Sequence, residues 1–309
     1  MPVGDYLFYL IQITMITIQN FTSKQVTRLR EMGRTRTSET YQATLNSFTH
    51  FCKEQPFPIQ QIDSDTIERY EAWLRQRQLS RNSSSFYMRV LRRIYNMAAE
   101  EGLVEQGNPF RMVYTGIDKT SKRAITEANI RRIKHLELGD QTSLLFARDM
   151  FLLSFYLRGM SFIDMAYLRK HDLHNGYLTY NRRKTGQRLT IQWENAMQDI
   201  VNRHPNPTSD YLLPIITRED GTERRQYQNQ QVRVNRNLKV IGRMAHLSIP
   251  LTMYVARHSW ASIAYRKHVP LSVISEGMGH DSETTTQIYL ATIQTNLVDR
   301  ANQRIIHSI

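Results

Sequence analysis

Apolar residues recur at the three-and-four spacing of an α-helix along most of this chain of 309 residues, and one short region breaks the pattern. A chain of this kind folds by packing amphipathic helices around shared cores. In the first hundred residues we predict one helix capped by Ser38, a second opening at Asp63 and a third running from about Ser84 to Glu101. The third should stop at Gly102, a residue suited to the left-handed conformation after a helix.

The third predicted helix carries two different faces. Its apolar stripe is expected to consist of Phe86, Val90, Ile94 and Met97. Its basic residues Arg89, Arg92 and Arg93 are three and four residues apart on another face, where helical geometry groups them.

The interruption lies in residues 176–193, where the apolar period falls to two. Residues 176–180 and 188–193 alternate as strands do, and residues 184–187 between them are polar. This pattern predicts a β-hairpin with Lys184 at its tip. Helical patterning resumes near Glu194 and, after Pro214, near Tyr227. We therefore predict a mainly α fold with a small β-sheet.

The length allows two domains, each with its own core. No apolar period continues from Asn108 to Arg123, and Thr126 then restarts a helix. The expected layout is an N-terminal extension over 1–20, a helical domain over 21–116, a linker over 117–124 and a second domain over 125–309 that ends in a tail helix. The apolar run 6–18 is too short to span a bilayer and lacks the flanks of a signal peptide, so we expect it to pack on the protein or to be an over-long start.

The charge balance points to a polyanionic partner. Lys and Arg number 41 against 28 Asp and Glu, a net charge of +13, and each neutralised phosphate would release condensed counterions. Charge favours nucleic acid but does not separate DNA from RNA or from an anionic membrane. The single cysteine, Cys52, excludes an intramolecular disulfide and a cysteine-based zinc site, and fits a cytoplasmic setting.

The sequence blocks near the C-terminus are the most specific signal in the chain. They read RHSWA from Arg257, then Gly279-His280, then TTTQIY ending at Tyr289, with nine residues from His280 to Tyr289. Together with the Lys184 hairpin, these ordered blocks resemble the tyrosine recombinase, or phage integrase, family over nearly the whole chain. By this resemblance the first part is a core-binding, SAM-like helical domain that binds DNA, and residues from about 124 form the catalytic domain.

The resemblance implies a division of roles that chemistry explains. Tyr289 is expected to attack a DNA phosphodiester and to hold the strand as a 3′-phosphotyrosine, which keeps the bond energy for rejoining. Arg257 is expected to clamp the non-bridging oxygens with its planar fork, and His280 to donate a hydrogen bond to the same phosphate. Lys184 is expected to protonate the leaving 5′-oxygen. His258 is expected to be structural.

Two positions depart from the family pattern. Tyr254 stands where the family usually has His or Lys, so the base role is shared with His280 or partly lost. Counting back from the acidic Asp164, Ser161 stands where the first arginine belongs, and Arg158 lies three residues earlier. If this stretch is helical, three residues rise about 4.5 Å on one side, and Arg158 would substitute. The alternative is that Arg158 pairs with an acid and Ser161 alone faces the phosphate. Asp164 is expected to support the site.

Duplex DNA is the expected partner, gripped by a two-domain clamp. The candidate contacts, for each of which a solvated basic face is the alternative, are Arg81, Arg89, Arg92, Arg93, Lys122 and Arg123. The resemblance implies a homotetramer in the synapse, with an accessory DNA-bending protein as a further partner. The segment after Tyr289 should form a helix with Leu297, Ala301 and Ile305 on one side, packing on a neighbouring protomer.

No metal, nucleotide cofactor or membrane contact is expected, since His171 and His174 lack further ligands and no phosphate-cradling glycine loop occurs. Two rival functions stay open: a DNA-binding regulator that has lost cleavage, and a relaxing enzyme of the type IB topoisomerase kind. The sequence leaves open whether the reaction integrates, excises or inverts DNA.

Overall fold

The computed structural model describes residues 16–118, 123–280, 282–284, 286–287, 303 and 306–307. The chain divides into two compact units, Met1–Thr120 and Ser121–Ile309. Four predicted features lie wholly or largely outside the described residues: Lys122, Tyr289, residues 6–15 of the apolar run 6–18, and most of the predicted tail helix.

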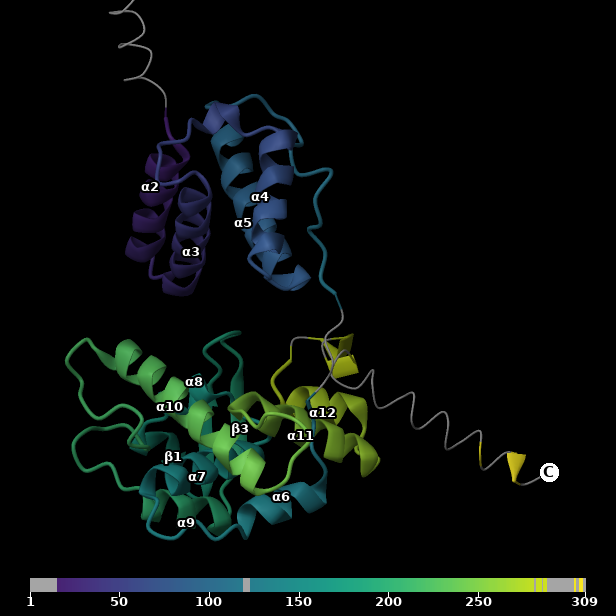
Figure 1. Cartoon of the computed structure of the whole chain (residues 1–309). Coiled ribbons are helices and arrows are strands. Elements are labelled where there is room, and N and C mark those ends of the chain that lie inside the picture. The colour runs from purple at the N-terminus through teal and green to yellow at the C-terminus, as the bar shows by residue number, and fades with distance from the viewer. Residues whose placement is uncertain are drawn as a thin grey trace, which may run out of the picture. The chain divides into compact units, whose positions relative to one another are not determined.

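The described residues of the first unit form four α-helices and one short 3-10 turn, with α2 beside α3 and α4 beside α5 (Figure 1). Their bounds are α2 Ile18–Glu31, α3 Thr35–Phe51, η1 Ile59–Gln61, α4 Ser64–Gln76 and α5 Arg81–Glu100. Phe48 and Tyr70 are fully buried in the middle and meet edge-on, with ring centroids 5.1 Å apart.

Helix starts in this unit follow the caps, although one prediction was misplaced. Asp63 caps α4 as predicted, its Oδ1 accepting the Thr66 N–H at 2.8 Å. α5 begins three residues earlier than predicted because Ser80 caps it. The predicted cap at Ser38 is wrong: α3 begins at Thr35, and Ser38 lies inside it, buried, with Oγ donating to the Thr35 carbonyl at 2.7 Å.

The predicted apolar stripe of α5 matches the buried face only in part: Ile94 is fully buried, and Val90 and Met97 pack against the edge of the core. Phe86, Val90 and Met97 are only partly buried. The buried hydrophobic face consists of Met88, Leu91, Ile94, Tyr95 and Ala98. Both sets are spaced three and four apart, so helical period alone cannot choose between them, and packing against α3 and α4 decides.

The segment after α5 belongs to the core of the first unit for part of its length. Phe110 and Val113 are buried there, although no apolar period marks them. Further along, the Asp118 N–H donates to Asn82 Oδ1 at 2.8 Å, which ties residue 118 back to α5.

The second unit places one apolar helix at its centre and packs the others around it (Figure 1). α7 contacts α6, α9, α10 and α11, and its residues are apolar on most sides, so it forms the middle of the core. The helical bounds are α6 Glu127–Lys134, α7 Thr142–Tyr156, α8 Phe162–Ala166, η2 Lys170–Asp172, α9 Asn195–Arg203, α10 Glu223–Met244, α11 Met253–Arg266 and α12 Leu271–Gly277.

A three-stranded antiparallel sheet, in the order β1-β2-β3, is attached to these helices. Its strands are β1 Leu173–His174, β2 Tyr177–Asn181 and β3 Arg188–Gln192. Tyr177 pairs with Gln192 and Asn181 with Arg188, which confirms the predicted hairpin. β1 was not predicted, since two residues are too few to show alternation.

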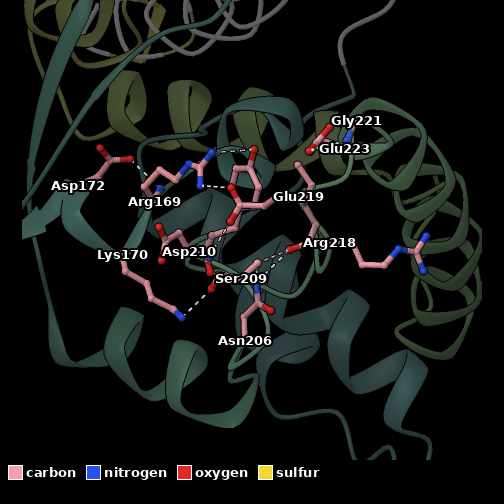
Figure 2. A network of polar contacts seen from close by, with 12 residues as sticks. Arg169, Lys170, Asp172, Asn206, Ser209, Asp210, Arg218, Glu219, Gly221 and Glu223 are labelled. Carbon is pink, nitrogen blue, oxygen red and sulfur yellow. Dashed lines mark hydrogen bonds and ion pairs between the residues drawn. The ribbon is translucent and has the colours of Figure 1, made fainter.

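A polar network holds the long loop between α9 and α10 (Figure 2). Arg169 Nη1 donates to Glu219 Oε2 at 2.6 Å, and its guanidinium stacks over the Tyr211 ring at 4.0 Å. Asn206 Nδ2 lies 3.0 Å from the carbonyl oxygens of Tyr211, Leu213 and Ile216. The loop held by these contacts is followed by α10, which begins at Glu223, one turn before the predicted start near Tyr227.

Within the described ranges, no helix has both the length and the apolar character needed to cross a bilayer. Among the same residues, no three His, Cys, Asp or Glu side chains gather closely enough to hold a metal ion.

Candidate active site

Arg257 lies at the centre of a group of side chains that come from four separate segments of the second unit. It stands in the second turn of α11, whose first N–H is accepted by Asn235 Oδ1 at 2.9 Å. Its guanidinium is buried and donates from Nη1 to the Gly159 carbonyl at 2.9 Å and from Nη2 to the Met278 carbonyl at 2.7 Å. These bonds orient the planar fork before any ligand arrives.

The turn at Gly159 approaches α11 so closely that a side chain cannot fit between them. A Cβ added to Gly159 would stand 2.6 Å from the Arg257 Cα, and Gly159 has a left-handed φ of 74°. Because Gly159 has no side chain, its carbonyl can come close enough to accept the hydrogen bond from Arg257.

His280 contacts Arg257 directly. Its Nε2 lies 2.9 Å from Arg257 Nη2, and its Nδ1 lies 2.7 Å from Thr286 Oγ1. An arginine only donates, so Nε2 accepts here and Nδ1 carries the proton that is given to Thr286. Burial, together with the positive charges of Arg257, Arg182 and Lys184, lowers the pKa of His280 to about 4. The imidazole is therefore neutral at pH 7.

Thr286 is fully buried and precedes Tyr289 by three residues in the sequence. Its hydroxyl ties the beginning of the tyrosine-bearing segment to His280. Tyr289 itself lies outside the described residues.

Lys184 stands exposed at the tip of the β2–β3 hairpin, as predicted from the sequence. The residue before it is fixed, because the Arg183 N–H donates to Asp164 Oδ1 at 2.9 Å. Asp164 is buried and also accepts the Ser161 hydroxyl at 2.6 Å on its other oxygen.

Arg182 is a residue of this site that the sequence reasoning missed. It is 9% exposed, and its Nη1 donates to the Gly279 carbonyl. Strand alternation contained the signal, since Arg182 continues the inward face of Leu178 and Tyr180.

The proposal that Arg158 and Ser161 share one helical face is wrong. α7 ends at Tyr156, Arg158 has a left-handed φ of 58°, and α8 begins only at Phe162. Ser161 is the N-cap of α8, with its hydroxyl turned to Asp164, so the chain turns sharply between the two residues.

Arg158 nevertheless lies beside the site, because its side chain approaches the end of α12. Its Cδ lies 3.6 Å from the point where a Cβ on Gly277, at the end of α12, would stand. Burial raises the pKa of Tyr180, while the positive charges of Arg257, Arg182 and Arg158 oppose that rise. Three guanidinium groups therefore act on one buried tyrosine.

Tyr254 lies one turn before Arg257 on α11 and is 57% exposed. Its ring meets the buried His258 edge-on, with centroids 4.4 Å apart. It lines a pocket of about 330 Å³ that also includes Arg257, Ser161, Thr252 and Gln231. An open hollow thus borders Arg257.

Three of the arginines predicted to contact DNA have protein partners in this structure. Arg81 stacks on the Tyr114 ring at 3.7 Å, Arg92 donates to Thr115 Oγ1 at 3.3 Å, and Arg93 pairs with Glu100 at 2.9 Å. Arg89, on the same helix, is half-buried, and Arg123 is exposed. Exposed pairs of this kind contribute little to stability, so phosphates can replace them at small cost.

Comparison with known proteins places both units. The profile of the phage integrase SAM-like domain matches residues 17–115, and that of the phage integrase family matches residues 124–295. Tyrosine recombinase XerA of Pyrococcus furiosus is 28% identical over 243 residues, 76% of this chain and 79% of that protein. Tyrosine recombinase XerC of Oceanobacillus iheyensis is 26% identical over 269 residues, 83% of this chain and 86% of that protein.

Solved structures agree on the fold. A lambda integrase dimer bound to a COC′ core site has a TM-score of 0.64 at 16% identity, covering 89% of this chain and 95% of that chain. XerH recombinase in a post-cleavage complex with its difH substrate has a TM-score of 0.63 at 16% identity, covering 90% and 84%. The mainly helical fold, with a SAM-like first domain and a catalytic domain, is thereby confirmed. The family profile covers more than half of the sequence, and the chain belongs to the phage integrase family of tyrosine recombinases, enzymes that cleave and rejoin DNA at specific sites.

Proposed function

We propose that this chain recombines DNA by attack of Tyr289 on a phosphodiester in the centre formed by Arg257, His280 and Lys184. The tyrosine oxygen bonds to phosphorus as the bond to the 5′-oxygen breaks. The tyrosine proton passes to solvent, and Lys184 Nζ donates a proton to the leaving oxygen, which departs as a 5′-hydroxyl. Rejoining reverses these steps with the 5′-hydroxyl of a partner strand.

Charge in this centre suits the phosphoryl transfer. The Arg257 guanidinium is held by the Gly159 and Met278 carbonyls, so its orientation is set before the phosphate binds, and only the Nη2 bond to His280 Nε2 has to be given up. The protonation of His280, which is neutral without a ligand, responds to the phosphate. The negative charge of the phosphate raises the pKa of the imidazole, and this favours a proton on Nε2 that forms a hydrogen bond to the phosphate. Tyr254, which lines the neighbouring pocket, can donate a hydrogen bond to a phosphate oxygen.

We assign the role of the family's first arginine to Arg158. Ser161 is unsuited to clamp a phosphate, because its hydroxyl caps α8 and donates to Asp164. Arg158 approaches the end of α12 and adds its charge to those of Arg257 and Arg182 around Tyr180.

The observation that carries this function is the chain of contacts from Arg257 through His280 to Thr286, since these contacts end three residues before Tyr289 in the sequence. The test is covalent trapping on nicked DNA that carries the recombination site, without metal or ATP. We expect the wild type and a Tyr177→Phe control, altered at an exposed strand tyrosine, to form a denaturation-resistant adduct, and Tyr289→Phe to form none. Tight binding without any adduct would support the non-cutting regulator instead.

A relaxing enzyme is separated from a recombinase by substrate. Supercoiled plasmid lacking the site should remain supercoiled with this protein, whereas a topoisomerase-like activity would relax it.

We further propose that the active assembly is a tetramer on two duplexes, with the first unit and the arginines at 81, 89, 92, 93 and 123 and Lys122 contacting DNA. Lambda integrase has been solved as a tetramer on a Holliday junction. In this chain, deleting the segment after Tyr289 should weaken synapsis more than binding to a single site. Equal loss of both would oppose a role of the tail in assembly. A cytoplasmic setting, a mobile element as substrate and an accessory DNA-bending protein belong to the same proposal.

A further inference from the structure

Arg182 is a buried cation beside the site to which the proposed chemistry assigns no step. Its Nη1 donates to the Gly279 carbonyl, in the residue directly before His280. The Arg182 Cδ lies 3.2 Å from where a Cβ on Gly279 would stand, so the arginine stem packs against the bare glycine. Arg182 therefore joins the hairpin to the turn that carries His280.

A second contact fixes the same hairpin from α8. The buried Asp164 accepts the Arg183 N–H at 2.9 Å, and the Ser161 hydroxyl at 2.6 Å holds the other carboxylate oxygen. Arg183 stands between Arg182 and Lys184 in the sequence. Both contacts thus end within two residues of Lys184.

The hairpin tip is also closed internally. The Arg182 N–H donates to the Gln187 carbonyl at 2.8 Å, and the Gly186 N–H donates to the Arg182 carbonyl at 2.7 Å. Lys184 itself is exposed, and its long, flexible side chain has no rigid geometry of its own. The position of its Nζ must therefore come from the backbone that carries it.

We propose that Arg182 is a positioning residue for Lys184, which locks the hairpin tip to the Gly279–His280 turn so that the lysine meets the leaving 5′-oxygen. This inference rests on the proposed role of Lys184 as general acid. Arg182 suits the task because one guanidinium reaches a backbone carbonyl while its stem fills the space over Gly279.

The test replaces the leaving oxygen by sulfur. In a DNA site with a bridging 5′-phosphorothiolate, the tyrosine–phosphorus bond forms as the phosphorus–sulfur bond breaks, and the thiolate leaves without needing a proton. A variant that fails only in delivering the proton cleaves the sulfur substrate normally. A variant with a disordered phosphate clamp fails on both substrates.

Cleavage of both substrates would be measured for the wild type, Lys184→Ala, Arg182→Met, Arg182→Lys and Arg183→Ala. Losing general acid catalysis should slow oxygen cleavage by about 10²–10⁴-fold in Lys184→Ala. Arg182→Met should cleave the oxygen substrate almost as slowly as Lys184→Ala and should cleave the sulfur substrate at the wild-type rate. Arg182→Lys should fall between Arg182→Met and the wild type. Arg183→Ala removes the neighbouring charge but keeps the backbone N–H that Asp164 binds, so its oxygen-to-sulfur ratio should match that of the wild type.

Several outcomes overturn the inference. If Arg182→Met matches the wild type on oxygen, or if the folded Arg182→Met and Arg182→Lys proteins stay slow on sulfur while Lys184→Ala recovers, Arg182 does not act through the lysine. If Arg182→Met does not fold, Arg182→Lys decides alone. If Lys184→Ala itself stays slow on sulfur, the general-acid role fails, and that failure belongs to the proposed function.

Discussion

Gly159→Ala perturbs the closest approach in the proposed active site. The added methyl carbon would stand 2.6 Å from the Arg257 Cα and 3.0 Å from its Cβ and Cγ. Ordinary carbon contacts lie near 3.5–4.0 Å, so the turn or α11 has to move by about 1 Å. The obstruction is helix backbone, which cannot rotate away as a flexible side chain would.

Two costs add for this substitution. A left-handed backbone at a residue with a Cβ costs about 1–2 kcal/mol. Overpacking a dense interior costs about 1–3 kcal/mol more, giving a loss of unfolding free energy of about 2–5 kcal/mol. The Gly159 carbonyl also holds Arg257 Nη1, and a displacement of about 1 Å at a catalytic group can lower the cleavage rate by about 10²-fold.

The matched control is Gly176→Ala, in the turn between β1 and β2. Gly176 has a left-handed φ of 76°, but a Cβ there meets nothing within 4 Å, so only the backbone cost applies. Urea unfolding would measure stability, and single-turnover cleavage of nicked site DNA would measure the rate. We expect Gly176→Ala to lose about 1–2 kcal/mol and to keep its cleavage rate.

If Gly159→Ala is as stable as Gly176→Ala and cleaves at the wild-type rate, the close approach to Arg257 controls neither stability nor catalysis. Normal cleavage with a large stability loss would show that Arg257 is positioned without the Gly159 carbonyl.

Three further predictions concern other buried contacts. The fully buried Asp149 accepts bonds from Arg203 and His204 at 2.9 and 3.0 Å, so Asp149→Ala should cost about 3–5 kcal/mol in urea unfolding. Burial raises the pKa of Asp149, but the hydrogen bonds from His204 and Arg203 outweigh burial and hold the pKa below 3.8. The stability that the ionised Asp149 contributes is therefore present above about pH 4 and is lost as pH falls through the folded pKa. A difference in unfolding free energy between the wild type and Asp149→Ala that does not change with pH would contradict this. Arg158→Ala should slow cleavage far more than Ser161→Ala, and a near-normal Arg158→Ala enzyme would defeat its assignment to the first-arginine role. Thr286→Val should slow cleavage, because it leaves the buried His280 Nδ1–H without its acceptor, a loss of about 1–3 kcal/mol. Thr286→Ser keeps a hydroxyl and should cleave near the wild-type rate. Equal cleavage rates for the two variants would show that the hydroxyl has no role.

Features set by neighbouring residues were predictable from the sequence. The Asp63 cap and the 176–193 hairpin follow from local backbone chemistry and side-chain alternation. The order and spacing of the C-terminal blocks identified the family, and the structure brings Arg257 and His280 together.

Features set by distant contacts were not predictable in this way. Helical period allowed two faces for α5, and only packing selected the one that includes Met88. The expectation that 158–161 is helical failed because the chain reverses at Arg158 and Gly159, where the close approach to Arg257 demands a left-handed turn. Arg182 was missed because its partner, the Gly279 carbonyl, lies 97 residues away and is a backbone atom.

The amino acid that becomes joined to the DNA can be identified directly. The adduct formed on nicked site DNA would be trimmed with nuclease, digested with protease and sequenced by mass spectrometry. We predict a nucleotide-bearing phosphotyrosine at Tyr289 and at no other tyrosine. A nucleotide on any other residue, or an adduct whose yield is unchanged in Tyr289→Phe, would rule out Tyr289 as the nucleophile.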